Sequence, residues 1–350
     1  MIENLLLTGG SGFLGKELLE LLVQDDRICK VTVLSRVHRS HSNPKVEFRQ
    51  MDLSDPKSTA DLGYGYDAVI HLAGLYDFER DLRDNYSQNV LSMVNLIEAL
   101  EKSSANSKRK IPIYFASTYA VGAGFEAVLD EVPLKRLPTK DYSYALTKAI
   151  AERALTDLGA QSKLRPHIFR LGILVGSDLD GEIEKADGPY EFLKQMRTLA
   201  GVPGTGWISH IPIPGARKGL LPLVPVNYAA RVFHAALFSS ELSNCPSGAA
   251  SIYGVYNTDS VRLEDFCREA VPRYFPRGEL VYFDKIPDVG KVFRGLKKKT
   301  EAFRYSLNPI RLDNSRFQKV FPELKIPAFA DYRAVFFKGF ESYSAEQELN

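Results

Sequence analysis

Short apolar runs and amphipathic stretches alternate through the first half of the chain. The apolar runs lie at residues 5–7, 31–34, 46–48, 68–72, 111–116 and 167–169. Hydrophobic positions with helical spacing lie at residues 16–24, 89–100 and 144–158. Strands that alternate with helices are typical of βαβ units, whose parallel strands form a sheet covered by helices on both faces. We therefore predict an α/β fold with a doubly wound parallel sheet.

The pattern changes after about residue 172. Proline and glycine become dense between residues 202 and 219, which predicts a long loop or a lobe boundary. A strand with a helix after it, a further strand and a further helix are expected at residues 223–238, 251–256 and 263–274. We expect a first domain over residues 1–172 and a smaller C-terminal substrate-binding lobe over residues 173–350. Segments near residues 220–260 are expected to return to the first domain.

Composition and charge narrow the class of protein. Hydrophobic residues make up 45% and charged residues 25% of the 350 positions, as in ordinary globular enzymes. The 45 Lys and Arg nearly balance the 43 Asp and Glu. This balance argues against a nucleic-acid partner, which would need a concentrated basic face. The three cysteines lack metal-ligand spacing, so we expect no metal site, no disulfide framework and a reducing cytoplasm.

Membrane features are weak in this sequence. No apolar run approaches the ~20 residues that span a bilayer. The run at residues 2–7 ends in a glycine turn, so it predicts a first strand rather than a signal segment. Lysines at residues 297–299 beside Phe293 and Leu296 would allow a peripheral membrane contact. We favour a solvated helix face for this segment.

A glycine-rich turn follows the first predicted strand and opens the first predicted helix. It reads Thr8, Gly9, Gly10, Ser11, Gly12, Phe13, Leu14 and Gly15. Glycines here permit a tight turn, a close approach of the backbone to a pyrophosphate, and close packing of helix on strand. The helix N-terminus adds free N–H groups and a partial positive charge. The turn predicts a dinucleotide-binding Rossmann domain.

The end of the second strand distinguishes NAD from NADP. An acidic residue there would bind a ribose 2′-hydroxyl, whereas basic residues would accept a 2′-phosphate. The chain has Ser35 and Arg36, with Arg39 following, and no carboxylate. We favour NADP(H) and keep NAD(H) as the alternative. Asp52 and Leu53 are placed to meet the adenine edge, although Asp52 could instead cap the short helix that follows.

Tyr144 and Lys148 lie one turn apart on the same face of a predicted helix. A free tyrosine has a pKa of about 10, and a nearby ammonium would lower the pKa of the phenol. Such a pair can exchange a proton with a carbinol oxygen. Ser117 and Thr118 end the fifth strand, where a hydroxyl can face a ligand bound beyond the carboxyl ends of the strands.

Taken together, these motifs resemble the extended short-chain dehydrogenase/reductase family. The resemblance also uses His71, Leu72, Ala73, Gly74 and Asn89, and it continues through residues 170–172 and 224–228. It implies that Tyr144 is the general acid/base, that Lys148 holds the nicotinamide ribose, and that Ser117 or Thr118 meets the substrate carbonyl. It adds cofactor contacts at Leu72, Ala73, Gly74, Asn89, Gly172 and Leu174. It also implies a homodimer through helices near residues 85–103 and 142–158.

Departures from the usual pattern point to one branch of that family. Ala120, Val121 and Gly122 replace the Val-Tyr-Gly that is common in sugar-nucleotide enzymes, and Leu171 replaces a proline. The segments at residues 71–77 and 181–190 look like the fatty-acyl-CoA and thioester reductase branch, with its male-sterility-type NAD-binding domain. Tyr76, Asp77, Thr118 and Tyr190 would then line the substrate site. Tyr76, Asp77 and Tyr190 could equally be packing residues.

The first functional hypothesis is an NADP(H)-dependent oxidoreductase that reduces a carbonyl or an acyl thioester with a Ser-Tyr-Lys set. The second is a nucleotide-sugar epimerase or dehydratase with tightly bound NAD. The third, from another class, is a non-catalytic NADP(H)-sensing regulator. An intact Ser117, Tyr144 and Lys148 argues against the third, because a sensor does not need all three.

Overall fold

The structure is a computed structural model of the whole chain. It describes residues 1–63, 65–76, 81–104, 110–124, 128–204, 209–214, 217–244, 250–283 and 310–349. Asp77 and the lysines at residues 297–299 lie outside the described residues.

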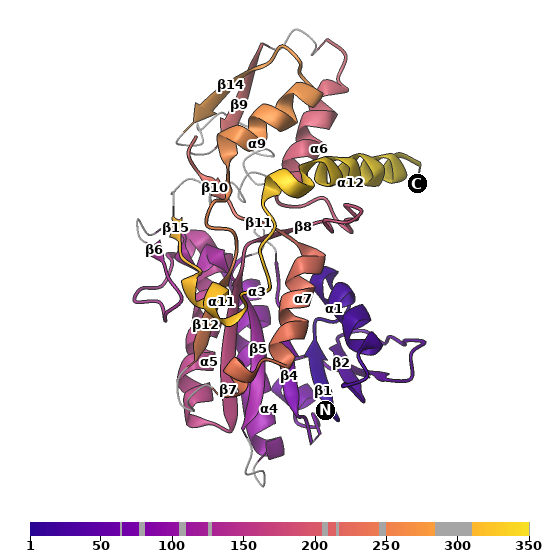
Figure 1. The fold of residues 1–350 in the computed structure, drawn as a ribbon, viewed down its shortest axis with the longest axis vertical. Helices are drawn as coiled ribbons and strands as arrows, with labels where there is room; N and C mark the ends of the chain where they lie inside the picture. Colours follow the sequence, from indigo (N-terminus) through magenta and orange to yellow (C-terminus); the bar gives the residue numbers. More distant parts are fainter. Residues whose placement is uncertain are drawn as a thin grey trace.

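Seven parallel strands form the central sheet, in the order β12-β7-β5-β4-β1-β2-β3 (Figure 1). The strands are β1 (Leu5–Thr8), β2 (Val31–Ser35), β3 (Val46–Gln50), β4 (Ala68–His71), β5 (Ile111–Thr118), β7 (Leu164–Leu171) and β12 (Ser251–Val255). The order reverses between β1 and β4, which leaves a crevice beyond their carboxyl ends. The predicted Rossmann-type α/β fold is confirmed.

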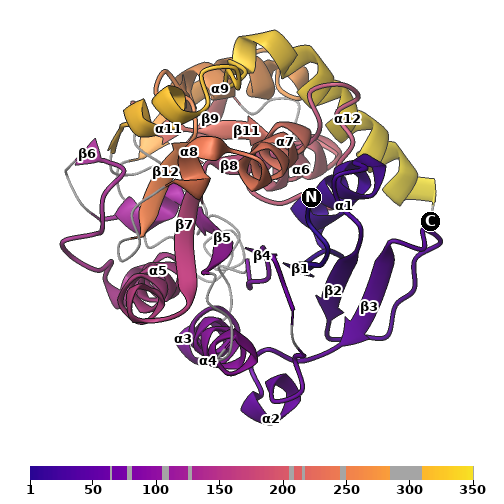
Figure 2. The same ribbon diagram turned by 60° about the horizontal axis from the view of Figure 1, so that its bottom comes forward.

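Helices cover both faces of this sheet (Figure 2). Leu5 and Leu7 of β1 pack in the same core as α1 (Phe13–Gln24) and α7 (Val226–Leu237). Leu6, between them, packs with α4 (Ser92–Ser104) and α5 (Ser143–Gln161). The apolar run of β1 is continuous because each face of the strand is buried against a helical layer.

A second core of mainly aromatic residues lies beyond the sheet. It joins α6 (Pro189–Ala200), α9 (Leu263–Ala270), α12 (Phe329–Leu349) and the paired strands β9 (His210–Pro214) and β14 (Glu279–Phe283). We call these five elements the lobe; they lie above the sheet in Figure 1. The loop expected at residues 202–219 contains β9, so that prediction was wrong in part. Proline fits β9 because this strand has a single neighbour among the described residues.

Late segments of the chain return to the sheet. The helix α7 and the strand β12 pack there, and so does α11 (Ser315–Val320), through Phe317. Short pairs connect the parts: β8 (Ile173–Val175) with β11 (Leu223–Pro225), β10 (Leu220–Leu221) with β13 (Val261–Arg262), and β6 (Val128–Leu129) with β15 (Arg311–Leu312). The remaining elements include α2 (Pro56–Thr59), α3 (Leu82–Tyr86), the π-helical turn η1 (Ser87–Leu91), η2 (Tyr119–Gly122) and α8 (Ser240–Ser243).

Residues 176–188, which we call the strap, join β8 to α6 and cross the lobe. Gly181 has a φ of +76°, and a Cβ on it would lie 2.3 Å from the Val335 carbonyl oxygen of α12. A Cβ on Gly339 would lie 1.9 Å from the Gly181 oxygen. The two backbones therefore touch where only glycine fits. Farther along the strap, Glu184 forms an ion pair of 2.5 Å with Lys16 of α1.

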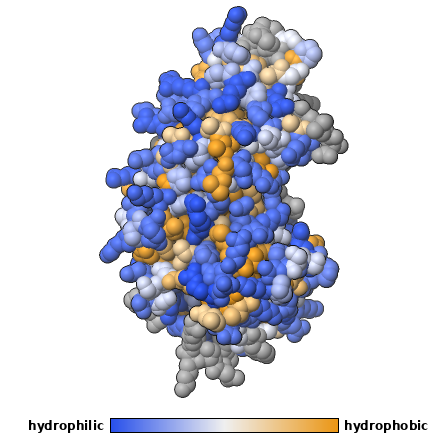
Figure 3. All heavy atoms as spheres, turned by 45° about the vertical axis from the view of Figure 1, so that its right-hand side comes forward, coloured by the Kyte–Doolittle hydropathy of each residue, from blue (hydrophilic) through white to orange (hydrophobic). Residues whose placement is uncertain are grey.

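Among the described residues, no helix is long and apolar enough to cross a bilayer. On the face drawn in Figure 3, hydrophobic residues form small groups among hydrophilic ones.

Candidate active site

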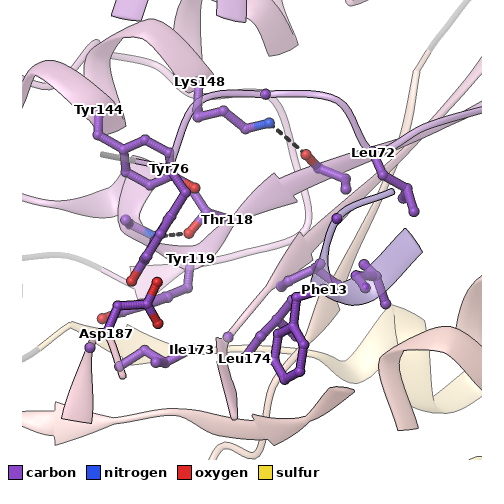
Figure 4. Close-up of a pocket in the computed structure, with 18 of the residues that line it drawn as sticks. Phe13, Leu72, Tyr76, Thr118, Tyr119, Tyr144, Lys148, Ile173, Leu174 and Asp187 are labelled. Carbon is purple, nitrogen blue, oxygen red and sulfur yellow. Dashed lines mark hydrogen bonds between the residues drawn. The ribbon is translucent and has the colours of Figure 1, made fainter. Parts of the chain in front are cut away.

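A cavity of about 440 Å³ opens beyond the carboxyl ends of β1, β4, β5 and β7. Its volume lies within the range of ~300–1,000 Å³ that is usual for small-molecule sites. The sheet side contributes Gly9, Gly12, Phe13, Leu14, Gly15, Leu72, Gly74, Tyr76, Thr118, Tyr144, Lys148, Gly172 and Leu174, among others. The strap and the lobe contribute Glu184, Lys185, Asp187, Gly188, Pro189 and Phe266. Figure 4 shows the central part of this lining.

The glycine turn brings backbone groups close together at one end of the cavity. Gly9 has a φ of +74°, and a Cβ on it would lie 2.6 Å from the Ala73 nitrogen. A Cβ on Gly15 would lie 2.1 Å from the Gly9 oxygen. Gly12 precedes the first turn of α1 and provides no capping side chain. The N–H groups of this turn therefore remain suited to an anion, as the phosphates of a dinucleotide require.

Thr8 fastens this turn to the end of β4. Its hydroxyl oxygen accepts a hydrogen bond of 3.2 Å from the Ala73 nitrogen and lies 2.7 Å from His71 Nδ1. Burial lowers the pKa of His71 to about 3, so the imidazole is neutral. The Thr8 hydroxyl then donates to Nδ1 while it accepts from Ala73. Thr8 and Ala73 thus hold the backbone of the turn rather than line the cavity.

Asn89 anchors the loop after β4 from the other side. Its side-chain oxygen accepts 2.8 Å from the Leu75 nitrogen, and its amide donates 3.1 Å to the Thr147 hydroxyl of α5. The π-helical turn η1 sets this position of Asn89. In the described structure Asn89 therefore positions the loop that borders the cavity.

The end of β2 lies outside the cavity lining. Ser35 is buried and Arg36 is exposed. The Arg36 guanidinium donates a hydrogen bond of 3.2 Å to the Gln88 side chain. Arg36 is thus an exposed cation near the carboxyl end of β2.

Asp52 and Leu53 also lie outside the lining. The Asp52 carboxylate accepts hydrogen bonds from the Ser54 nitrogen and hydroxyl, at 2.9 and 2.7 Å. The helix α2 is capped instead by Asp55, which accepts from the Lys57 nitrogen at 2.9 Å. The alternative that Asp52 caps this helix was therefore wrong. Leu53 is buried in the core on the α4 side of the sheet.

Tyr144 and Lys148 project from α5 into the cavity, and both are buried. Lys148 Nζ donates a hydrogen bond of 2.7 Å to the Ala116 oxygen (Figure 4) and lies 4.2 Å from the centre of the Phe115 ring. Burial lowers the pKa of Lys148 to about 7, although the Glu152 carboxylate opposes this shift. Burial also raises the pKa of Tyr144, and its hydrogen bond with Thr118 opposes that rise. The expected lowering of the Tyr144 pKa is thus absent from this arrangement.

Ser117 and Thr118 both line the cavity but differ in their hydrogen-bond partners. The Ser117 hydroxyl donates a hydrogen bond of 2.5 Å to Glu152 Oε1. Thr118 lines the cavity and shares a side-chain hydrogen bond with Tyr144. Its hydroxyl also accepts 3.2 Å from the Ala120 nitrogen (Figure 4). Of the two hydroxyls that the sequence left open, Thr118 is the one beside the phenol.

Glu152 and Arg170 form a buried ion pair that the sequence analysis missed. Arg170 Nη2 lies 2.7 Å from Glu152 Oε2, and the guanidinium also donates to the carbonyl oxygens of Asp130 and Val132. The sequence contained a signal for Glu152, because this residue follows Lys148 by one helical turn on the same face of the helix. Pairing and hydrogen bonds offset the cost of burying these charges.

The predicted substrate residues separate into two groups. The Tyr76 ring packs edge-on against the Tyr144 ring at 5.4 Å between centroids, and it lines the cavity. Tyr190 lies outside the lining: its hydroxyl accepts 2.9 Å from the Gly176 nitrogen, and its ring stacks on Phe336 at 4.5 Å. Tyr190 therefore packs the lobe, which was the other interpretation that the sequence allowed.

The apolar part of the lining has no local sequence motif. Ile173, Leu221 and Phe266 come from three separate segments and meet only in the folded chain. Gly172 allows this approach, because a Cβ on it would lie 2.1 Å from the Pro222 oxygen.

A parallel sheet with a glycine turn at its switch point, and a Tyr144–Lys148 pair in the cavity, define the extended short-chain dehydrogenase/reductase class. The sequence profile of the NAD dependent epimerase/dehydratase family matches residues 5–239, and the chain belongs to this family. It is accordingly an enzyme of the NAD(P)-dependent oxidoreductase type.

Three similar proteins illustrate the range of this family. The hybrid PKS-NRPS synthetase gkaA of Penicillium citrinum is 26% identical over 63% of the chain, which spans 6% of that protein. The terminal R domain from the myxalamid PKS-NRPS biosynthetic pathway superposes with a TM-score of 0.74 at 19% identity, covering 98% of this chain and 91% of that one. A UDP-galactose 4-epimerase superposes with a TM-score of 0.66 at 17% identity, covering 97% and 99%.

Proposed function

We propose that this protein is an NADP(H)-dependent reductase of a carbonyl or an acyl thioester. The observation that carries the proposal is the composition of the cavity. Its lining combines the polar side chains of Thr118, Tyr144 and Lys148 with apolar side chains that include Ile173, Leu221 and Phe266. An apolar wall beside a proton donor suits an acyl or alkyl carbonyl compound.

The same cavity suits a sugar nucleotide poorly. A diphosphate needs cations or free N–H groups in addition to those that hold the cofactor. Among the described lining residues the cations are Lys148 and Lys185, while Glu184 and Asp187 add negative charge. The similarity to a PKS-NRPS R domain supports a reductase, and the similarity to a UDP-galactose 4-epimerase keeps epimerisation as the competing activity.

The residues present fit a nicotinamide dinucleotide. The glycine turn would receive its phosphates, Ser35 and Arg36 would meet a 2′-phosphate, and Lys148 would meet the nicotinamide ribose. Leu72, Gly74 and Leu174 line the cavity between these positions. When bound, the nicotinamide supplies the hydride that reduces the carbonyl carbon.

The side chains supply positioning and the proton. Because burial raises the pKa of Tyr144, its phenol stays protonated and can donate to the carbonyl oxygen. Thr118 holds the Tyr144 hydroxyl and can orient the same oxygen. Lys148, with a pKa of about 7, can take up and release a proton near neutral pH beside the phenol. Tyr144 is thus the proposed proton donor at the oxygen of the substrate, and Lys148 can return a proton to it.

The test compares substrates on the purified enzyme. Octanoyl-N-acetylcysteamine, octanal and UDP-glucose are each supplied with NADPH, NADH or NAD, and products are identified by mass spectrometry. We expect NADPH oxidation that matches aldehyde or alcohol formation. Interconversion of UDP-sugars with NAD, without NADPH oxidation on either octanoyl compound, would replace the reductase with the epimerase.

We further propose a homodimer through α3, η1 and α5. Apolar side chains that are about two-fifths exposed lie on these elements: Leu82, Tyr86, Leu91 and Leu158. Sedimentation of the wild type and of Tyr86→Glu tests this face. We expect a dimer that the substitution weakens; a monomeric wild type would refute the proposal.

A further inference from the structure

The strap places a carboxylate in the cavity near the catalytic tyrosine. Asp187 lines the cavity, and Figure 4 shows Tyr76 lying between Tyr144 and Asp187. Gly188 follows with a φ of +54°, a backbone conformation that favours glycine, and Pro189 begins α6. A Cβ on Gly188 would lie 3.8 Å from the Tyr76 hydroxyl. The local backbone is therefore built to bring Asp187 beside Tyr76.

The surroundings of Asp187 raise the pKa of its carboxyl above the ordinary value. Burial raises the pKa of Asp187 and the neighbouring Glu191 carboxylate adds to this rise, whereas Lys185, 3.7 Å away, opposes it. The side chain is half-buried, so it can exchange protons with water at the mouth of the cavity. The strap holding it is fixed at Gly181 on α12 and at Glu184 on α1.

Reduction of a thioester requires a proton at a second atom. After hydride reaches the carbon and Tyr144 protonates the oxygen, the tetrahedral carbon carries a hydroxyl and a sulfur substituent. The C–S bond then breaks, its electron pair goes to sulfur, and the hydroxyl proton returns to Tyr144 as the aldehyde forms. The departing sulfur must gain a proton, because a free alkyl thiol has a pKa of about 8.5. Tyr144 and Thr118 are both committed to the oxygen.

We propose that Asp187 is the second acid of this site and protonates the departing sulfur of an acyl thioester. Its carboxylate then regains a proton from water. The inference rests on the proposed function and narrows its substrate class from carbonyl compounds in general to thioesters. An aldehyde has no leaving group, so its reduction does not need this acid.

The experiment compares Asp187→Asn with the wild type on two substrates. Turnover of octanoyl-N-acetylcysteamine includes the departure of a thiol. Turnover of octanal includes only hydride transfer and protonation of the oxygen. We expect the ratio of thioester to aldehyde turnover to fall by about tenfold or more, within the range of general acid catalysis. Turnover of the thiophenyl ester of octanoic acid should fall much less in this variant, because its thiolate leaves without protonation.

A matched control comes from the same strap. Glu182 is exposed and lies outside the described lining, so Glu182→Gln makes the same chemical change without reaching the cavity. We expect it to keep the wild-type ratio. The inference would be overturned if Asp187→Asn lowered turnover equally on the thioester and on the aldehyde. It would also be overturned if the loss of turnover did not depend on the leaving group. In both cases the proposed function would stand. A wild type that reduces octanal but no thioester would overturn the thioester assignment itself.

Discussion

The Ser117 hydroxyl donates a hydrogen bond of 2.5 Å to Glu152, whose carboxylate also binds Arg170 at 2.7 Å. Thr118, the next residue of the strand, bonds instead with Tyr144, two turns earlier on the same helix α5. Both residues line the cavity, but the Ser117 hydroxyl binds the buried Glu152 carboxylate, whereas the Thr118 hydroxyl meets the phenol of Tyr144.

Replacing each hydroxyl should separate these two roles. Thr118→Val keeps the shape of the side chain and removes the hydrogen bond to Tyr144, so we expect kcat to fall by about 10²-fold, as when one oxyanion donor is lost. Ser117→Ala should leave kcat within a few-fold but lower the free energy of unfolding by about 1–3 kcal/mol, because the buried Glu152 loses a donor. Steady-state kinetics and urea unfolding measure both. An inactive Ser117→Ala beside an active Thr118→Val would reverse the assignment.

Tyr144→Phe should remove the proton donor while the cavity keeps its shape. We expect turnover to fall by about 10²–10⁴-fold, the usual contribution of a general acid. Cofactor affinity, measured by NADPH fluorescence titration, should stay within a few-fold. Loss of affinity with turnover preserved would show that Tyr144 acts in binding.

Arg36→Ala should discriminate between the two cofactors. The exposed guanidinium lies at the carboxyl end of β2. In dinucleotide-binding folds that use NADP, an arginine near this position binds the 2′-phosphate. We expect NADPH affinity to fall by about tenfold or more and NADH affinity to change little, since a charge-assisted hydrogen bond contributes ~1.5–3 kcal/mol. Arg153→Ala, on an exposed position of α5, controls for the loss of one positive charge. Equal losses for NADPH and NADH would remove the argument for NADP(H).

His167 should make stability sensitive to acid. Both ring nitrogens are buried without a hydrogen-bond partner, and the ring stacks on Tyr114 at 5.2 Å. Burial, reinforced by Arg165 and Arg316, lowers the pKa of His167 to about 3 from 6.5. The unfolded chain therefore binds a proton below pH 6.5 that the folded chain refuses until about pH 3, so stability falls as pH falls through this window.

His167→Phe should flatten that dependence. A phenyl ring suits the aromatic stack and has no polar atoms, so we expect the free energy of unfolding at neutral pH to rise by about 1–3 kcal/mol. Urea unfolding across the same pH window measures both effects. The buried His71, with a pKa of about 3, should leave part of the acid dependence in place. An unchanged slope would show that His167 is not responsible.

The sheet, its flanking helices and the cofactor turn could be predicted from the sequence, because each depends on a local pattern of residues. Apolar runs bounded by helical spacing predicted β1 and α1, and the glycines between them predicted the tight turn. The proximity of Tyr144 and Lys148 could also be predicted, because residues four positions apart lie on one face of a helix however that helix packs.

Features that depend on distant partners could not be predicted in this way. Which of Ser117 and Thr118 faces Tyr144 depends on how α5 packs against β5. The pairing of β9 with β14 joins residues far apart in the chain, and Pro212 lies within β9. Asp187 lies in a strap that contacts α12 at Gly181 and α1 at Glu184, and neither contact is local in the sequence.

The contact between Gly181 and Gly339 also joins the strap to a helix that is made late in synthesis. Domains fold from the N-terminus as a chain is translated, so the glycine turn and the Tyr144–Lys148 pair can form early. The helix α12, which contacts the strap, leaves the ribosome long after them. Until α12 docks, the strap lacks its backbone contact with Gly339 and has only the Glu184–Lys16 ion pair. We therefore expect the part of the cavity that Asp187 lines to be completed only when this helix is made.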